Sequence, residues 1–354
     1  MSELEKVMED KLIRQLTTGV SQWTYRPDIK TEDDLWNNLR KRLNFANRSK
    51  LGEQLITDAE MAQIKEFIRR IGTSAYKAGL WLSGEHGVAQ IPLQREDARL
   101  GTISLAALDS SNVAGGTSCY EVTNQYQSSK DDGLMSRDRR FDVTLLINGL
   151  PLIHIELKSR NHPFMDAFRQ IQKYQAEGKF TGIFGLVQMF VVSNGTNTYY
   201  IASSTPDQLN EKFLTRWVDQ DNNPVDDYIG FAKEALHVPE AHKMVCLYSV
   251  LDSDSRRVIL LRPYQIHAIK AVEQATKEHR SGFIWHTTGS GKTLTSFNVT
   301  SNLLDIPSVD KAVFLIDRHD LDQQTSMSFM SYHAHTLKPE LPKNENFLGS
   351  MSEK

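Results

Sequence analysis

The segment FDVTLLINGLPLIHIELKSR, residues 141–160, decides the fold because it contains two apolar strands joined by a strong turn signal. The dipeptide Asn148-Gly149 is typical of a tight turn in a β-hairpin. Glu156 and Lys158 are two residues apart, so they share one face of the second strand. The apolar residues Ile153, Ile155 and Leu157 point to the other face. The segment therefore predicts an antiparallel hairpin with charged groups on one face.

The register of this hairpin determines whether Asp142 lies beside Glu156. A two-residue turn pairs position 142 with position 155 and leaves Asp142 on the opposite face. A three-residue loop over 148–150 pairs Asp142 with Glu156 and sets two carboxylates side by side. Pro151 is tolerated at the start of a strand, and the turn glycine suits a type I turn with a G1 bulge. We therefore expect the three-residue loop.

Two opposed carboxylates destabilise a hairpin unless a positive group neutralises them. A Mg²⁺ ion does this with one or two carboxylates, and water and phosphate oxygens complete its coordination. Asp142 and Glu156 are therefore candidate metal ligands, and Lys158 would stabilise charge on a phosphate under attack or orient the attacking water. The alternative is an exposed Glu-x-Lys pair on an amphipathic strand, which is a common pattern.

Several other residues are weaker candidates for the same site. Glu9 has helical spacing with Leu12 and Leu16, an inward line on which a lone carboxylate needs a partner or a metal. Gln170 and Tyr174 are four residues apart on one side of a predicted helix. The alternative for each is a satisfied polar residue at the edge of the core. The basic run 137–140 is a candidate for phosphate contacts without sequence specificity, and the alternative is a solvated charge run, which is the commoner case.

The surrounding pattern predicts helices first and strands afterwards. A helix is expected up to Gly19, and capping-box pairs predict two more, one starting after Thr31 and one running from Thr57 to Gly72. Residues 206–250 return to helical patterns around a polar break at 219–227. Between Gly72 and residue 206 we expect one helix, from Pro163 to Gly178. The strands expected in the same region are at 119–126, 141–147, 152–158, 187–193 and 198–202.

A new unit starts near Asp252 and contains TTGSGKT at residues 287–293. The expected elements are a helix over 264–277, a strand over 282–286, a helix over 294–303 and a strand over 311–317. This alternation is typical of a βαβ unit in a parallel α/β sheet.

The glycine-rich segment predicts a phosphate-binding loop. Backbone N–H groups close around phosphate oxygens, and the N-terminus of the next helix faces the same anion. The residues expected to surround the phosphates are Thr288, Gly289, Ser290 and Gly291. Lys292 would reach the β- and γ-phosphates of ATP, and the Thr293 hydroxyl would bind Mg²⁺. His286 stands where the full pattern has glycine, so the alternative is a glycine-rich turn that happens to precede Lys-Thr.

Two flanking segments extend this nucleotide site. The Gln265 amide can pair with the edge of adenine, although a polar helix start is the simpler interpretation. The polar residues from Arg318 to Gln324 follow a predicted strand, where α/β sheets bind ligands, and a solvated loop is equally compatible with them.

Length, charge and composition limit the classes of protein to which this chain can belong. The chain has 354 residues, which suggests two or three domains, and its net charge of −3 does not indicate a globally basic nucleic-acid-binding protein. Two cysteines cannot form a disulfide framework, and no apolar run is long enough to cross a membrane. Because the first ten residues are acidic and resemble no signal peptide, we expect a cytoplasmic protein.

The combination of Asp142, Glu-x-Lys, Gln-x-x-x-Tyr and His-Thr-Thr-Gly-Ser-Gly-Lys-Thr resembles the N-terminal part of the R (HsdR) subunit of type I restriction endonucleases. The resemblance runs from Glu9 to Gln324. It implies an α/β protein in which a PD-(D/E)xK nuclease-like mixed sheet flanked by helices, residues 1–250, precedes a partial RecA-like parallel α/β lobe, residues 251–354.

The resemblance also implies roles for individual residues. Asp142, Glu156 and Lys158 match the metal-binding and catalytic residues of the nuclease, and Glu9 resembles its helical acidic residue. Gln170 and Tyr174 match a motif that helps to hold DNA at the cleavage site. Lys292 and Thr293 match the first motif of an ATP-driven duplex-DNA translocase, in which Gln265 would read adenine and residues 318–324 would face the DNA backbone. The implied partners are double-stranded DNA and separate methyltransferase (M) and specificity (S) subunits.

The sequence departs from this family in its motor motifs. Such a motor needs an Asp-Glu-x-His motif, and the 62 residues after Lys292 contain no Asp-Glu. We therefore expect the chain to dock ATP without hydrolysing it, and to be a fragment of a longer protein. Two alternatives stay open: a noncatalytic module that binds DNA or a partner, and a self-contained phosphate-loop ATPase with an unrelated N-terminal region.

Overall fold

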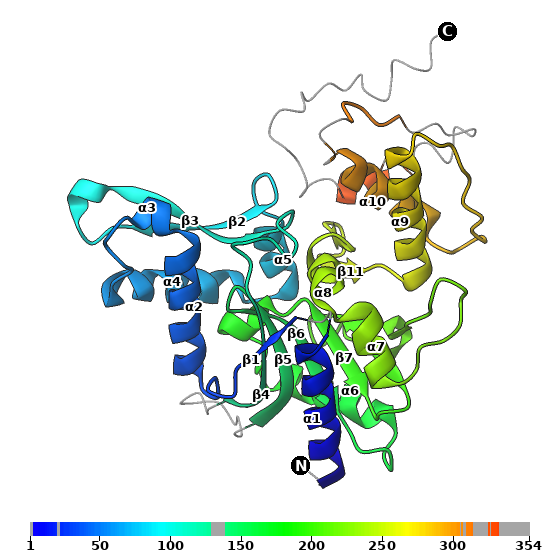
Figure 1. Ribbon diagram of the computed structural model, residues 1–354, viewed down its shortest axis with the longest axis horizontal. Helices are drawn as coiled ribbons and strands as arrows, with labels where there is room; N and C mark the ends of the chain where they lie inside the picture. Colours follow the sequence, from blue (N-terminus) through cyan, green and yellow to red (C-terminus); the bar gives the residue numbers. More distant parts are fainter. Residues whose placement is uncertain are drawn as a thin grey trace.

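A seven-stranded mixed β-sheet with helices packed around it forms the centre of the protein (Figure 1). The computed structural model describes residues 3–19, 22–128, 139–304, 306, 309–313, 325 and 327–332. The strands, in spatial order, are β1 (Thr24–Tyr25), β4 (Tyr120–Ser128), β5 (Arg139–Ile147), β6 (Leu150–Leu157), β7 (Met189–Ser193), β8 (Thr198–Ala202) and β9 (Thr215–Arg216). β1 pairs with β4 and β6 with β7 in parallel, and the other neighbours are antiparallel. The expected mixed α/β architecture is confirmed.

The helices agree with the main sequence signals. They are α1 (Glu3–Thr17), α2 (Glu32–Ala46), α3 (Arg48–Leu51), α4 (Asp58–Ile71), α5 (Ala75–Ser83), α6 (Phe164–Ala176), α7 (Tyr228–Ala235), α8 (Val238–Cys246), α9 (Pro263–Lys277) and α10 (Lys292–Leu304), with 3₁₀ turns η1 (Ala98–Leu100), η2 (Gly182–Leu186) and η3 (Glu211–Phe213). Both predicted capping boxes form, at Thr31 and Thr57, because each threonine and the acidic residue three positions later satisfy exposed backbone donors.

Two hairpins were not predicted from the sequence. They are β2 (Val88–Gln94) with β3 (Thr102–Asp109), and β10 (Ser249–Asp252) with β11 (Arg257–Leu260). Each forms its own two-stranded sheet beside the central one.

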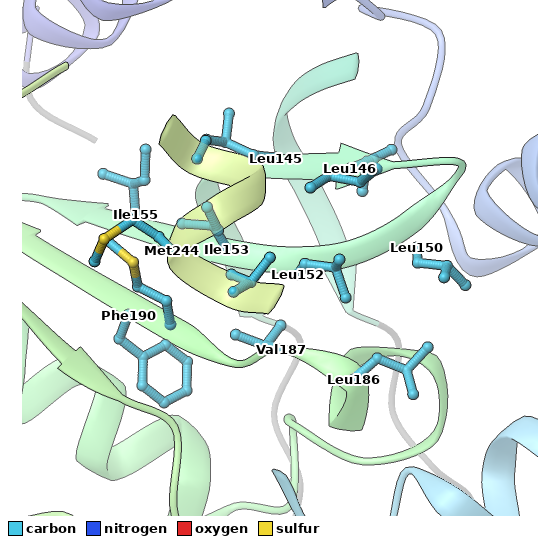
Figure 2. Close-up of a cluster of buried hydrophobic side chains, with 14 of the residues drawn as sticks. Leu145, Leu146, Leu150, Leu152, Ile153, Ile155, Leu186, Val187, Phe190 and Met244 are labelled. Atoms are coloured by element: carbon cyan, nitrogen blue, oxygen red, sulfur yellow. The ribbon is translucent and has the colours of Figure 1, made fainter. Parts of the chain in front are cut away.

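The hairpin of β5 and β6 lies in the centre of the core. Every residue of β6 is buried, including the polar residues His154 and Glu156. Figure 2 shows side chains of β5 and β6 packed with Phe190 of β7 and Met244 of α8. Each large apolar side chain buried in this way contributes about 1.5–3 kcal/mol, so the hairpin is among the most constrained parts of the chain.

The expected partner of Asp142 is confirmed, but the expected turn is wrong. Ile147 pairs with Leu150, so the turn has two residues, and both have positive φ: +53° at Asn148 and +81° at Gly149. The register then shifts at a β-bulge, where the consecutive residues 145 and 146 pair with 153 and 151. The extra residue in β6 sets Asp142 and Glu156 one position beyond the pair of Val143 and Ile155, which is the alignment that the three-residue loop predicts.

Residues 219–250, which include α7 and α8, contact both the sheet-bearing part of the chain and α9. The Trp23 indole donates to the carbonyl of Leu236, between α7 and α8, at 2.7 Å. On the other side, Lys270 of α9 donates to Glu240 of α8 at 2.7 Å. Residues 219–250 therefore connect the sheet-bearing part to the phosphate-loop part.

The strand predicted over residues 282–286 is absent from the structure, and that prediction is wrong. Phe283 and Trp285 are 88% and 87% exposed. A strand persists only where a neighbouring strand satisfies its backbone groups, and no segment in the described part of the chain pairs with this one. Of the second predicted strand, 311–313 are unpaired and 314–317 lie outside the described residues. The predicted helices over 264–277 and 294–303 are confirmed as α9 and α10.

Replacing Asn148 by alanine should destabilise the fold by about 2–4 kcal/mol. The Asn148 side chain accepts a hydrogen bond from the Cys119 backbone N–H at 2.8 Å and donates one to the Ala107 carbonyl at 3.0 Å. Alanine loses both bonds and is strained at positive φ. Urea unfolding measures the change, and Asn222→Ala is the control because Asn222 is exposed and also has positive φ. Equal losses in the two variants would show that only backbone strain matters.

Candidate active site

Asp142, Glu156 and Lys158 meet at the ends of β5 and β6. Val143 pairs with Ile155, so Asp142 and Glu156 are the next residues along the two strands, and the charge of each carboxylate acts on the other. The Leu157 backbone N–H donates to Asp142 Oδ2 at 2.9 Å, and Lys158 Nζ donates to Glu156 Oε1 at 3.4 Å. The predicted constellation is therefore assembled by the hairpin alone.

Burial makes the two carboxylates costly to ionise together. Burial, and then the charge of Glu156, raise the pKa of Asp142 well above its ordinary value. Burial also raises the pKa of Glu156 from 4.5 to about 7, although Lys158 opposes this shift. Glu156 is fully buried, whereas Asp142 is partly exposed and can be reached from solvent. A bound cation would stabilise the doubly ionised pair.

His154 is a further member of the site. Its Nε2 lies 3.3 Å from Glu156 Oε2 and its Nδ1 lies 3.3 Å from the Thr144 hydroxyl. Complete burial lowers the pKa of His154 to about 4, so the ring is neutral near pH 7. In the Nε2–H tautomer the ring donates to Glu156 and fixes the orientation of that carboxylate without adding a charge.

Glu9 of α1 approaches the same end of the sheet. Its carboxylate is buried and accepts hydrogen bonds from the side-chain amides of Asn124 and Gln125, the second at 2.5 Å. Burial raises the pKa of Glu9 to about 6, and the charge of Asp142 contributes to the increase. Glu9 is therefore within electrostatic range of the carboxylate pair.

The donor set fits Mg²⁺ through two carboxylates. Within the described residues no three or more His, Cys, Asp or Glu side chains are close enough to form a metal-binding group. Mg²⁺ does not need such a group, because it is commonly bound through one or two carboxylates and keeps several waters. Asp142 and Glu156 meet this requirement, and a direct role of Glu9 as a ligand stays a prediction.

Gln170 and Tyr174 lie together on α6. Gln170 Nε2 donates to the Tyr174 hydroxyl oxygen at 2.5 Å, and that hydroxyl donates to the Arg140 carbonyl at 3.2 Å. Burial raises the pKa of Tyr174, and the charges of Glu156 and Asp142 add to the shift. The phenol is thus neutral and lies near the carboxylates, where the structure uses it to join α6 to β5.

The phosphate-loop segment forms a compact turn before α10. Gly289 and Gly291 have φ of +77° and +78°, a conformation that glycine adopts without strain. Lys292 is exposed and its Nζ donates to the Thr287 carbonyl at 3.0 Å. Thr288, Ser290 and Thr293 belong to the same turn and helix start.

Gln265 is buried against this loop. Its Nε2 lies 3.3 Å from the Gly291 carbonyl oxygen and 3.2 Å from the Thr295 hydroxyl, and its Oε1 accepts from the Arg262 N–H at 2.8 Å. These bonds make Gln265 a support of the loop, and its adenine-reading role stays a prediction. The predicted motif over 318–324 lies outside the described residues, as do Arg137 and Asp138 of the basic run.

A groove of about 770 Å³ borders Arg139 and Arg140 at the start of β5, two to three residues before Asp142. Its charged lining residues are Lys65, Arg69, Arg139, Arg140, Glu32 and Asp33. Arg139 is paired with Glu177, and Arg140 is exposed. Cations thus outnumber acids along this wall.

The sequence interpretation missed three residues of the site. His154 could have been found, because it lies two positions before Glu156 and alternation puts both on one face. Asn124 and Gln125 carried no such signal, because their contact with Glu9 depends on a backbone conformation that the sequence does not specify.

Along the chain, the two carboxylates and the lysine of the mixed sheet precede the phosphate-loop turn. Family comparisons cover both of these regions. Residues 2–209 match the family described as type I restriction enzyme R protein N terminus, and the chain belongs to this family. Residues 264–349 match the SWI2/SNF2 ATPase family.

Individual relatives extend the similarity over most of the chain. The type I restriction enzyme SsaAORF53P endonuclease subunit of Staphylococcus saprophyticus is 35% identical over 330 residues, which are 93% of this chain and 33% of the relative. The SauCOLORF180P endonuclease subunit of Staphylococcus aureus is 34% identical over the same shares. The EcoprrI endonuclease subunit of Escherichia coli is 34% identical over 180 residues, 50% of this chain and 54% of that subunit. The chain thus spans about a third of the staphylococcal relatives.

None of the helices in the described ranges is long and apolar enough to cross a membrane.

Raising the pH should selectively destabilise the wild-type protein when divalent cations are absent. The folded-state pKa of Glu156 is about 7 and its ordinary value is 4.5, so the folded protein holds the proton more tightly than the unfolded chain. Stability is therefore lost as the pH rises through this window, and Glu156→Gln removes the effect. Between about pH 5 and pH 8 the variant should gain on the order of 2 kcal/mol relative to wild type in urea unfolding.

Glu177→Gln is a control, because the effect of Glu177 on stability is expected to change with pH in the opposite direction. The hydrogen bond from Arg139 lowers the pKa of Glu177, so its contribution is present at neutral pH and is lost on acidification. If wild type instead gained stability relative to Glu156→Gln as the pH rose, the raised pKa of Glu156 would be contradicted.

Proposed function

We propose that the chain carries a Mg²⁺-dependent DNA endonuclease site of the PD-(D/E)xK kind, with Asp142, Glu156 and Lys158 as its central residues. The observation that supports this most strongly is the alignment of two carboxylates in a buried hairpin with a lysine bonded to one of them. A structural ion pair has no need of the second carboxylate, because like charges in direct contact are destabilising. A phosphodiesterase site needs both, and the family assignment supports this choice.

The chain's own groups would prepare this site in a defined way. The Leu157 N–H fixes one oxygen of Asp142, and His154 and Lys158 each contact a different oxygen of Glu156. Mg²⁺ bound by these carboxylates would supply a Lewis acid that neutralises phosphate charge and activates water. Lys158 is partly exposed, so its ammonium group can leave Glu156 and donate to a phosphate oxygen.

DNA is the proposed substrate of this site. The relatives are named endonuclease subunits of type I restriction enzymes. The cation-rich groove beside Arg139 and Arg140 borders the strand that carries Asp142, and phosphate contacts of this kind position duplex DNA without reading its sequence. We propose that Gln170 and Tyr174 support the DNA-facing edge of α6, and that methyltransferase (M) and specificity (S) subunits supply sequence recognition.

The phosphate-loop region is proposed to dock MgATP. Gly289 and Gly291 give the loop its required conformation, and Lys292 and Thr293 start the helix that would face the phosphates. The family match over 264–349 supports an ATPase-like region. ATP-driven translocation of double-stranded DNA is proposed for the complete family enzyme.

Removal of either central group should strongly reduce metal-dependent cleavage. Asp142→Ala should lose both Mg²⁺ binding and the cutting of supercoiled plasmid, whereas Lys158→Ala should keep Mg²⁺ binding and cut at least about 100-fold more slowly. Calorimetric Mg²⁺ titration and a plasmid-nicking assay give the two measurements, and exposed Lys233→Ala is the charge-matched control for Lys158.

The same titration separates the nuclease from a noncatalytic binding module. In a module whose carboxylates are only structural, Asp142→Ala would leave Mg²⁺ affinity unchanged. That result, or undiminished cutting by Asp142→Ala, would exclude the proposed nuclease site.

Lys292→Ala should weaken binding of a fluorescent ATP analogue about tenfold or more, because it removes a charge-assisted contact to phosphate. Lys277→Ala, at the exposed end of α9, should bind the analogue as wild type does. Equal affinity in the two variants would argue against ATP docking at the loop. Measurable ATP turnover by the wild-type chain would instead favour a self-contained ATPase.

A further inference from the structure

Two neighbouring amides of β4 reach a single carboxylate of α1. Asn124 Nδ2 donates to Glu9 Oε1, and Gln125 Nε2 donates to Glu9 Oε2 at 2.5 Å. Both oxygens of the buried Glu9 carboxylate are therefore fixed by the same short segment of β4. The donors are uncharged, so they orient the carboxylate without neutralising it.

This convergence requires an unusual backbone. Successive side chains of a strand normally point to opposite faces. Here Gln125 has φ of +53°, in the left-handed region. The ladder between β4 and β5 pairs Asn124 with Val143 and Tyr126 with Phe141, and no pair joins Gln125 to Asp142. A non-glycine residue in this conformation costs about 1–3 kcal/mol, and such strain is concentrated at functional sites.

The orientation of the Asn124 amide is fixed as well. Its Oδ1 accepts hydrogen bonds from the Tyr25 hydroxyl at 2.9 Å and from Lys30 Nζ at 2.8 Å. Because donors occupy the oxygen, the NH₂ group must point to Glu9. Lys30 also donates to the Asn124 backbone carbonyl, which holds the segment from a second side.

We propose that Asn124 and Gln125 are positioning residues of the metal site, which hold Glu9 beside Asp142 so that its carboxylate acts on Mg²⁺ or on a water that the ion carries. The inference rests on the proposed function. The break in the β4–β5 ladder lies at Asp142 itself, so the strain is located where the nuclease chemistry is proposed.

Gln125→Gly tests the proposal because glycine adopts positive φ without strain and lacks the amide. We expect the variant to unfold in EDTA at nearly the wild-type temperature and to bind Mg²⁺ about tenfold more weakly, the effect typical of losing a partner of a metal site. Gln125→Glu, which keeps the size but places an acceptor against Glu9, should lose at least as much affinity. Calorimetric titration without nucleotide measures both.

Gln63→Glu is the control for the added charge, because Gln63 is exposed on α4 and its side chain bonds to the backbone of Gln94. It should bind Mg²⁺ as wild type does. Unchanged Mg²⁺ affinity in both Gln125 variants would overturn the inference. If Asp142→Ala loses Mg²⁺ binding while the Gln125 variants keep it, only this inference fails. If Asp142→Ala keeps it too, the proposed function fails.

Discussion

The contact between the carboxyls of Asp142 and Glu156 is the constraint on which the rest of the site depends. Glu156 lies in a strand that is entirely buried and Asp142 is only partly exposed, so water screens their repulsion weakly. Three contacts offset part of this repulsion. The Leu157 N–H donates to one oxygen of Asp142, and His154 and Lys158 each contact a different oxygen of Glu156. Protonation of one carboxyl or a bound cation would stabilise this pair.

Elements distant in sequence complete the site from the outer side. α1 brings Glu9 to the break in the β4–β5 ladder, and α6 brings Tyr174 into the field of the two carboxylates. α7 and α8 then join this part of the chain to α9 through the Trp23 and Lys270 hydrogen bonds. The membership in the type I restriction enzyme R protein family and the ATPase-like match fit this order of regions along the chain.

Much of the fold could be predicted because it rests on local chemistry. The capping boxes at Thr31 and Thr57 form as expected, since each involves residues only three positions apart. The prediction over 282–286 failed for the complementary reason: a strand depends on a neighbour, and its own composition cannot supply one. The predicted length of the hairpin turn was wrong, but the predicted alignment of Asp142 with Glu156 was right. A bulge at Leu152 and a longer loop produce the same alignment.

The sequence by itself determined the residue types at the candidate site and the order of the two regions, because the spacing of Glu156 and Lys158 and the glycines of the phosphate loop depend on residues only a few positions apart. Only the tertiary structure decided what surrounds them. The left-handed Gln125, the amides on Glu9 and the support of the loop by Gln265 join segments far apart in the chain. Such contacts depend on the packing of whole elements, and no local pattern specifies them.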